Sequence, residues 1–339
     1  MQRFDSIQTT FLFLAVGGIL FIGCSGDGSE SSEGSASWKA QNAGITEDLS
    51  GVSFTDADTG TVVGRSGLIL RTTDGGKTWA EQNSGTAHSL RDVSFTDANT
   101  GTVVGSNGTI RRTTDGGATW VPQTNQAEWN LAGVCMADAN TAFAVSNTTG
   151  IGTKKIYGTT DGGATWVEQY TSGRSLEAVS CIDANTATVV GSRGGSTGAE
   201  APANAIALRT TDGGATWLEQ DSGIAETLLD VMFTDASNGT AVGRAGTIVR
   251  TTDGGATWVT QRSGTLRDLR GVWFSDANNG TIVGPGGTIL RTTDGGATWV
   301  AQDSGTDENL SGVSFTDANT GTVVGSNGTI LRTTDGGGG

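Results

Sequence analysis

Seven aspartates recur at nearly regular intervals and are the first candidates for chemistry in this chain. Each lies in a Thr-Thr-Asp-Gly-Gly segment, and six segments continue to Thr-Trp. A carboxylate in such a turn can accept backbone N–H groups, and the glycines allow positive φ. Seven equivalent positions around a repeat cannot converge on one substrate, so we expect a structural role, with metal binding as the alternative. These aspartates are Asp74, Asp115, Asp161, Asp212, Asp253, Asp294 and Asp335.

Other residues suited to catalysis are scarce. His88 is the only histidine, which argues against histidine acid–base chemistry and multi-histidine metal sites. Glycoside cleavage needs two carboxylates facing one cleft, and no pair stands out from the repeat. The loop acids Glu200, Glu226 and Asp307 stay open as candidates for such a pair. We therefore expect no enzymatic activity, no metal and no cofactor.

The spacing of the aspartates predicts the architecture. They are separated by 41, 46, 51, 41, 41 and 41 residues, a period typical of repeat folds. In the unit from Leu90 to Gln123, β-rich runs at Leu90–Thr96, Thr102–Gly105, Thr109–Thr114 and Thr119–Gln123 alternate with turn residues. Four short antiparallel strands in each unit of about 40 residues indicate the blade of a β-propeller.

The two ends of the repeat array are complementary. The seventh copy stops at TTDGGGG, without the strand that carries Trp, whereas Ser37–Gln41 (SWKAQ) matches that strand. An N-terminal strand that completes the last blade explains both truncations and removes two open sheet edges. We therefore predict an all-β, seven-bladed propeller over residues 38–339, closed around Trp38.

Composition argues against nucleic acid as a partner, although a local basic patch on an acidic body stays open. The formal net charge is −15, whereas nucleic-acid binding requires a concentrated basic surface. The 55 glycines and 3 prolines fit many tight turns.

The N-terminus has the features of an export signal. Residues 11–24 are apolar, follow Arg3, and are too short to span a bilayer comfortably as a mature helix. The run ends in Phe21-Ile22-Gly23-Cys24, which resembles a bacterial lipobox. We expect a signal peptide at 1–24, a lipid on Cys24, and a Ser/Gly/acidic tether at 25–37, on the periplasmic or cell-surface side. Plain secretion and an uncleaved anchor are the alternatives.

The repeat resembles two described groups of proteins. S/T-x-D-x-G-x-T-W matches the Asp-box (bacterial neuraminidase) repeat, and GxxGxIxRTTDGGxTW in seven blades resembles the photosystem II stability/assembly factor family. That resemblance implies a protein-binding propeller of photosynthetic membranes, with an arginine patch contributing. Asp-box propellers also include sialidases, so a glycan-binding or glycan-cleaving surface protein is the alternative, as is a structural adhesion scaffold.

Six arginines precede the Asp box, and Gly158 interrupts their series. Each arginine could pair with a turn carboxylate, or the six could form the partner-binding patch that the family resemblance implies. They are Arg71, Arg112, Arg209, Arg250, Arg291 and Arg332.

Lengthened loops in the third and fourth units are the other candidate surface. Trp129, Lys154, Lys155 and Arg193 would form an exposed partner-binding patch there, since binding residues concentrate on loops; tolerated drift is the alternative. Cys135 and Cys181 occupy positions one apart in successive repeats. Because adjacent positions of a strand face opposite ways, we expect two buried thiols and no bridge.

Overall fold

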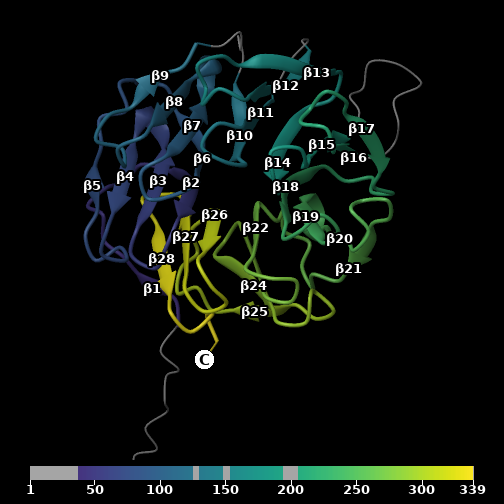
Figure 1. Cartoon of the computed structure of the whole chain (residues 1–339). Helices are drawn as coiled ribbons and strands as arrows, with labels where there is room; N and C mark the ends of the chain where they lie inside the picture. Colours follow the sequence, from purple (N-terminus) through teal and green to yellow (C-terminus); the bar gives the residue numbers. More distant parts are fainter. Residues whose placement is uncertain (1–36, 125–129, 148–152, 194–204, 339) are drawn as a thin grey trace, which may run out of the picture. The chain divides into compact units, whose positions relative to one another are not determined.

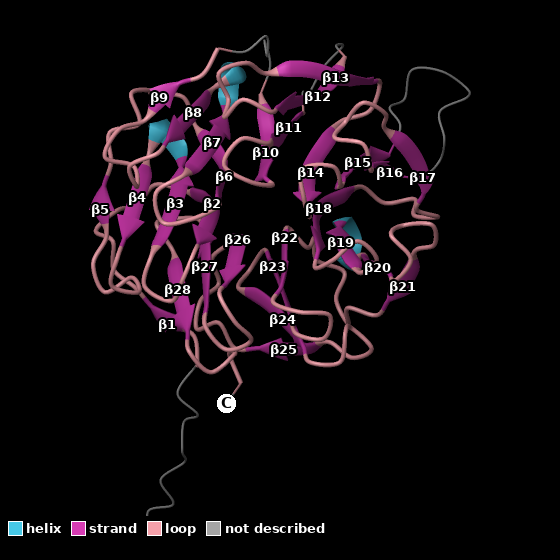
Figure 2. Ribbon diagram, in the orientation of Figure 1, coloured by secondary structure: helices cyan, strands magenta, loops and turns pink. Residues whose placement is uncertain are grey.

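The computed structural model describes residues 37–124, 130–147, 153–193 and 205–338. Residues 36–339 form one compact unit of seven four-stranded antiparallel sheets arranged in a ring, as Figures 1 and 2 show. The predicted seven-bladed propeller is confirmed.

The blades follow one another along the chain, and each runs from the inner to the outer strand. Blade 1 contains β2 (Leu49–Phe54), β3 (Gly60–Gly64), β4 (Ile69–Thr72) and β5 (Ala80–Glu81). Blade 2 contains β6 (Leu90–Phe95), β7 (Gly101–Gly105), β8 (Ile110–Thr113) and β9 (Val121–Pro122). Blade 3 contains β10 (Leu131–Met136), β11 (Ala142–Ser146), β12 (Lys154–Thr159) and β13 (Val167–Ser172). Blade 4 contains β14 (Leu176–Cys181), β15 (Ala187–Arg193), β16 (Ala205–Thr210) and β17 (Leu218–Asp221).

The remaining blades repeat the pattern. Blade 5 contains β18 (Leu228–Phe233), β19 (Gly239–Gly243), β20 (Ile248–Thr251) and β21 (Val259–Gln261). Blade 6 contains β22 (Gly271–Phe274), β23 (Gly280–Gly284), β24 (Thr288–Thr292) and β25 (Val300–Gln302). Blade 7 contains β26 (Leu310–Phe315), β27 (Gly321–Gly325), β28 (Ile330–Thr333) and β1 (Lys39–Ala40).

Blade 7 closes the ring as the two truncated ends predict. β1 pairs antiparallel with β28, with Lys39 opposite Arg332. The neighbouring Trp38 is only 3% exposed, and its Nε1 donates to Gln302 Oε1 of blade 6 at 3.0 Å. The Trp38 side chain therefore fills the position that the C-terminal copy lacks.

The hairpin between the second and third strands is a short 3-10 turn in three blades: Arg65–Gly67, Ser106–Gly108 and Arg244–Gly246. In blade 2, φ is 54° at Asn107 and 65° at Gly108, which explains why Asn-Gly predicts this turn. No helix of the described chain is long and apolar enough to cross a membrane. The predicted signal peptide, Cys24 and residues 25–36 of the tether lie outside the described residues.

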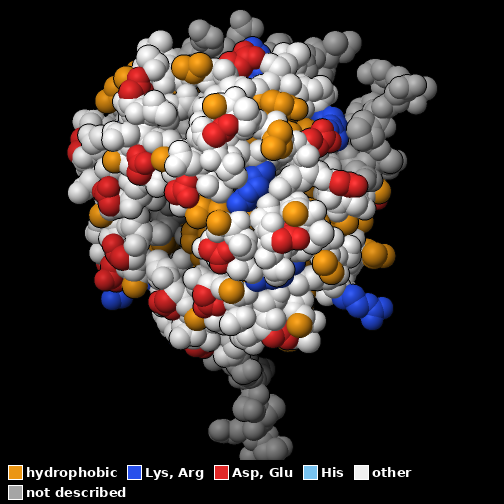
Figure 3. Space-filling model, turned by 45° about the vertical axis from the view of Figure 1, so that its right-hand side comes forward, with side chains coloured by type: hydrophobic (Ala, Val, Ile, Leu, Met, Phe, Trp, Pro, Cys, Tyr) orange, Lys and Arg blue, Asp and Glu red, His pale blue; other side chains and the backbone are white. Residues whose placement is uncertain are grey.

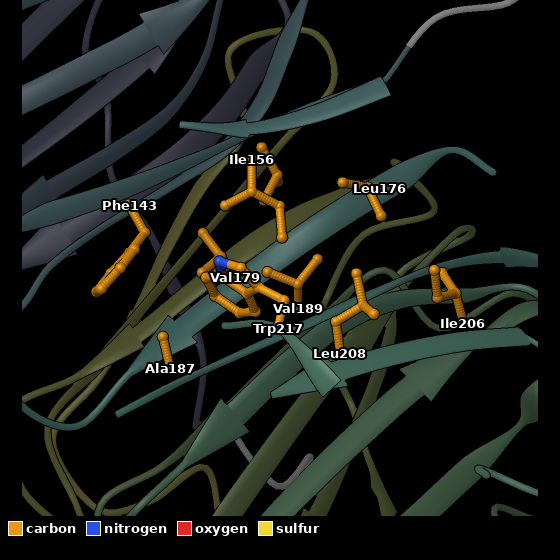
Figure 4. Packing of buried hydrophobic residues seen from close by; sticks show 10 residues of the cluster. Phe143, Ile156, Leu176, Val179, Ala187, Val189, Ile206, Leu208 and Trp217 are labelled. Atoms are coloured by element: carbon orange, nitrogen blue, oxygen red, sulfur yellow. The ribbon is translucent and has the colours of Figure 1, made fainter. Parts of the chain in front are cut away.

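The hydrophobic core lies between neighbouring blades. The second strands are buried on both faces, so Val103 and Val104 are both fully shielded from solvent. One cluster combines Phe143 and Ile156 of blade 3 with Trp217 of blade 4 and seven further side chains; Figure 4 shows them converging from different strands. Because burying one large aliphatic side chain contributes about 1.5–3 kcal/mol, each blade depends on its neighbours for stability.

The loops and turns lie on two opposite faces of the ring. One face carries the Asp boxes and the turns between the first and second strands, and we call it the Asp-box face. The other carries the blade-to-blade loops and the hairpins between the second and third strands, and we call it the loop face. On the loop face these two kinds of segment are hydrogen-bonded together, for example by Ser106 N donating to Ser89 O at 2.9 Å.

Candidate functional site

The Asp-box carboxylates are occupied by their own turns. Asp74 Oδ1 accepts hydrogen bonds from Thr78 N at 2.9 Å and Thr72 Oγ1 at 2.8 Å, and Oδ2 accepts from Thr78 Oγ1 at 2.6 Å. The Thr78 hydroxyl, followed by its backbone N–H, lowers the pKa of Asp74 to about 2. The other five complete boxes make the same contacts. In the truncated copy Asp335 lacks that threonine, and the Thr333 hydroxyl is the main group lowering its pKa.

These contacts favour the structural interpretation of the box. No three His, Cys, Asp or Glu side chains in the described residues lie close enough to share a metal ion. A glutamine of the outer strand also links each box to the preceding blade at most junctions. For example, Gln82 Nε2 donates to Gly116 O of the next box at 2.9 Å. The box therefore fixes both its own hairpin and the junction with the preceding blade.

The six arginines connect neighbouring blades. Arg250 Nη1 donates to Thr240 Oγ1 of its own blade at 3.0 Å, and Nη2 donates to Ala277 O of the next blade at 2.7 Å. Its guanidinium also lies over the Phe274 ring, 5.2 Å from the centroid. Burial lowers the pKa of Arg250, and nearby Asp235 acts in the opposite direction. The same set of carbonyl and hydroxyl acceptors serves Arg71, Arg112, Arg209, Arg291 and Arg332.

Of the two alternatives for these arginines, ion pairing with turn carboxylates is not observed among the described residues. Ion pairs among the described residues join Arg65 to Asp48, Lys155 to Glu168 and Arg174 to Glu219, and none uses an arginine of the ring. The turn carboxylates instead accept backbone N–H groups, as Asp97 does from Asn99 at 2.7 Å. Arg71 donates to the backbone carbonyl of Ala98 in that same turn. The arginine therefore binds the backbone of the turn and not the Asp97 carboxylate.

Replacing Arg250 by Gln is expected to destabilise the propeller by about 1–3 kcal/mol, because glutamine cannot make both charge-assisted hydrogen bonds and the ring contact. Urea unfolding measures this loss. Arg244→Gln is the matched control, because Arg244 is exposed in the same blade. Equal stability of the two variants contradicts a structural role and favours the partner-binding patch.

The junction of blades 3 and 4 is built differently from the others. Gly158 replaces the arginine, and Cys181 replaces the phenylalanine that the arginine covers elsewhere. Phe143 stands where other blades carry the arginine-binding threonine, and its ring packs edge-on against Trp217 of blade 4 at 5.9 Å. Phe143 therefore fills much of the space that the missing side chains leave.

A disulfide joins Cys135 of β10 to Cys181 of β14, with a Cα–Cα distance of 5.9 Å, so the expectation of two separate thiols is wrong. The alternation rule holds along one strand, but these cysteines lie on inner strands of two blades that face each other. At the neighbouring junction of blades 2 and 3, Met136 N donates to Ser94 Oγ at 3.0 Å. Those are the positions that the two cysteines occupy, so the one-residue offset brings them together.

The central channel is a second candidate site. It is a hollow of about 370 Å³ lined by the inner strands of all seven blades. Asp92 and Asp230 lie in its wall, where most other blades carry glycine. Asp230 Oδ2 accepts from Val272 N and Oδ1 from Val231 N, both at 2.8 Å, and Asp92 makes the equivalent contacts. Each carboxylate therefore also joins two blades.

Burial raises the pKa of Asp92 to about 6 and that of Asp230 to about 7, and the negative charge of Asp92 contributes to the shift at Asp230. At the loop-face end of the channel, Arg91 Nη1 donates to Asn147 Oδ1 at 3.3 Å, and Asn147 Nδ2 donates to Glu177 Oε2 at 2.8 Å. The channel thus offers polar groups of both signs.

The raised pKa of Asp230 predicts a pH dependence of stability. The folded-state pKa lies above the ordinary value of 3.8, so the stabilisation is complete below about pH 4 and is lost as the pH rises through about 7. Asp230→Asn cannot ionise, and its stability relative to wild type is expected to increase between about pH 5 and about pH 8. Urea unfolding at both pH values measures this. An equal change in the free energy of unfolding of the two proteins between these pH values contradicts the raised pKa of Asp230. The variant Asp235→Asn, at an exposed carboxylate, serves as control.

The predicted loop patch does not form as expected. Lys154 is buried, and Lys155 Nζ lies 2.5 Å from Glu168 Oε2. The reason is that β12 extends into the segment that the sequence assigned to a loop and pairs with β13. Trp129 lies outside the described residues, as does most of the lengthened loop that follows Arg193 at the end of β15.

The sequence analysis did not predict Asp92 and Asp230 as channel residues. Aligned blade by blade, Asp92 and Asp230 replace Gly51, Gly133, Gly271 and Gly312 within a strand, a signal that was available in the sequence. The glycines reflect close approach of the inner strands, since a Cβ on Gly51 would lie 3.0 Å from Asp92 Cα.

Comparison with known proteins agrees with the predicted resemblance. Residues 30–89 and 214–300 match the family model described as photosynthesis system II assembly factor YCF48. The structure titled "YCF48 bound to D1 peptide" is 20% identical, with a TM-score of 0.71 over 87% of this chain and 96% of that one. YCF48 from Cyanidioschyzon merolae is 22% identical, with a TM-score of 0.69 over 87% and 98%. The predicted resemblance to the photosystem II assembly factors is confirmed.

Enzymes share this fold as well. A GH74 enzyme from Niastella koreensis is 16% identical, with a TM-score of 0.67 over 88% of this chain and 54% of that one. The chain thus spans about half the length of that enzyme. No curated protein sequence matches the chain significantly. At such identities, structural likeness shows the fold alone.

Proposed function

We propose that this chain is a non-enzymatic propeller that binds another protein and is held at a membrane by a lipid on Cys24. The observation that carries protein binding is the likeness over nearly the whole propeller to the structure titled "YCF48 bound to D1 peptide", together with the family-model match. The Cys135–Cys181 disulfide supports export, because disulfides persist in oxidising compartments.

Cell fractionation tests the lipid anchor. The full chain is expected in the membrane fraction, and Cys24→Ala is expected to appear in the soluble or secreted fraction, because the buried acyl chains of the lipid on Cys24 would supply the membrane affinity. Ser25→Ala is the matched control. Membrane association of Cys24→Ala equal to wild type, together with a mature wild-type chain that still carries residues 1–23, contradicts lipidation and favours the uncleaved anchor.

Affinity capture from membranes, followed by quantification of one enriched protein, tests partner binding. In a source that carries photosystem II, its reaction-centre protein is the first partner to measure. A glycan-directed function is the second candidate, favoured by the two channel carboxylates and the GH74 likeness. Hydrolysis of oligosaccharides that Asp230→Asn abolishes, without any protein partner, establishes that alternative and overturns the proposal.

A further inference from the structure

One blade-to-blade loop departs from its equivalents on the loop face. The loops before blades 1, 2, 5, 6 and 7 each place seven residues ahead of a buried leucine. In four of them the first residue is Asn or Asp, whose side-chain oxygen accepts the N–H of the glycine two residues later, a cap that stabilises the turn. These four are Asn42, Asn83, Asp221 and Asp303, with distances of 2.9–3.0 Å.

The loop before blade 6, residues 262–268, which we call the basic loop, breaks this rule at three positions. Its first residue is Arg262, and arginine has no acceptor to cap Gly264 N. Its fifth residue, Leu266, is 88% exposed, where the other loops carry a smaller or polar residue. Its sixth is Arg267, where three other loops carry glutamate. The first two exchanges give up a cap and expose an apolar side chain, so local stability does not account for them.

The basic loop is nevertheless held in place. Arg267 Nη1 donates to Gly286 O at 2.8 Å and Pro285 O at 3.2 Å, which fixes the side chain without a carboxylate. Asp268 Oδ1 accepts from Ala245 N at 3.1 Å and ties the loop to the hairpin of blade 5. An ordered loop presents its side chains to a partner at little cost in conformational entropy.

The charge around the basic loop limits what it can bind. The loop before blade 7 carries Asp303, Asp307 and Glu308, and the loop before blade 5 carries Asp221 and Glu226. Figure 3 shows acidic side chains spread over the visible face, with basic ones in a few separate places. A broad anionic surface such as a membrane meets these acids on both sides of the loop. A narrow acidic segment can contact the arginines without covering the neighbouring acidic loops, and Asp268 of the basic loop is engaged by Ala245 N.

We propose that the basic loop, through Arg262, Leu266 and Arg267, binds an acidic segment of a partner protein whose apolar side chain covers Leu266. The inference rests on the proposed protein-binding function and names the chemistry of the partner. Charge complementarity sets the orientation and the association rate, and the desolvated leucine contributes to affinity.

The loop between blades 1 and 2 provides the replacement residues for a test. Asn83, Ala87 and His88 occupy the positions there that Arg262, Leu266 and Arg267 occupy in the basic loop. The full chain and the triple variant Arg262→Asn, Leu266→Ala, Arg267→His are titrated with a fluorescent peptide, Glu-Glu-Leu-Phe-Glu-Glu. Wild type is expected to bind it with salt-sensitive affinity, and the variant about tenfold or more weakly. The variant regains the cap, so its Tm is expected to equal or exceed that of wild type, which separates lost binding from lost folding.

Controls are the peptide with lysine for glutamate and the variant Asp303→Asn, which leaves the basic loop intact. Equal binding by the triple variant, no binding by wild type, or binding only to vesicles with about 30% phosphatidylserine overturns the inference. If the triple variant still captures the membrane partner of the wild-type chain, the proposed function stands and only this site fails.

Discussion

Reducing the Cys135–Cys181 disulfide is expected to lower the Tm of the propeller by roughly 5–10 °C. The bridge spans 46 residues, and the chain-entropy model assigns about 4 kcal/mol to a loop of that length. The blade 3–4 junction also lacks the arginine–phenylalanine contact found at most other junctions, so after reduction the packing of Phe143 against Trp217 holds it without that contact. Thermal unfolding with and without reductant measures the shift.

The double variant Cys135→Ser, Cys181→Ala is the control for this prediction. Serine is the residue that Ser53 and Ser94 place at the equivalent positions, so its hydroxyl can still accept the N–H at position 181 as at other junctions. The variant is expected to unfold near the Tm of the reduced wild-type protein, and its Tm is expected to be the same with and without reductant. A Tm equal to that of the oxidised wild type contradicts the role of the bridge.

Replacing Trp38 by Ala is expected to cost about 3–5 kcal/mol, as for other buried aromatic residues. Trp38 packs edge-on against Phe315 at 5.9 Å and donates to Gln302, whereas the N-terminal strand holds β28 through two paired positions and the hydrogen bond from Gln41 N to Ile330 O at 2.8 Å. Loss of the side chain therefore also weakens ring closure. Equilibrium unfolding in urea measures the change.

A second measurement separates closure from packing. An open blade 7 exposes the edge of β28, which can pair with another chain, so Trp38→Ala is expected to associate as its concentration rises. Trp258→Ala in blade 5 removes a similar ring contact, to Phe233 at 6.0 Å, without opening the ring, and is expected to stay monodisperse by light scattering. If Trp38→Ala stays monomeric and its free energy of unfolding is less than about 1 kcal/mol below that of wild type, closure of the ring by β1 is contradicted.

The fold was predictable because the repeat supplies seven parallel observations of one blade. Strand limits in the unit from Leu90 differ from the prediction by one or two residues, mostly where Thr and turn residues meet. The last repeat lacks its Trp-containing fourth strand, and the segment around Trp38 is the matching strand at the other end of the chain. The sequence therefore predicted that Trp38 completes the last blade. Periodicity and turn chemistry alone carry this information.

The contacts between blades were not predictable in the same way. Whether Arg250 meets Asp235 or Ala277 O depends on the offset between two sheets, which no local pattern sets. The same offset brings Cys135 to Cys181, against the alternation rule within a strand. Lys154 was predicted to lie in an exposed loop, but β12 of blade 3 begins at Lys154 and extends into the lengthened hairpin. The residues proposed for recognition depart from the repeat, so they become visible only when the blades are compared position by position.

Photo-cross-linking tests most directly whether the loop face of the propeller recognises a protein. A photoreactive amino acid is placed at Leu266 on the loop face and, in a second protein, at the exposed Lys77 on the Asp-box face, and both full chains are illuminated in membranes of the source organism. The account predicts one discrete protein adduct from position 266 and none from position 77. No adduct from position 266, or the same adducts from both positions, contradicts it.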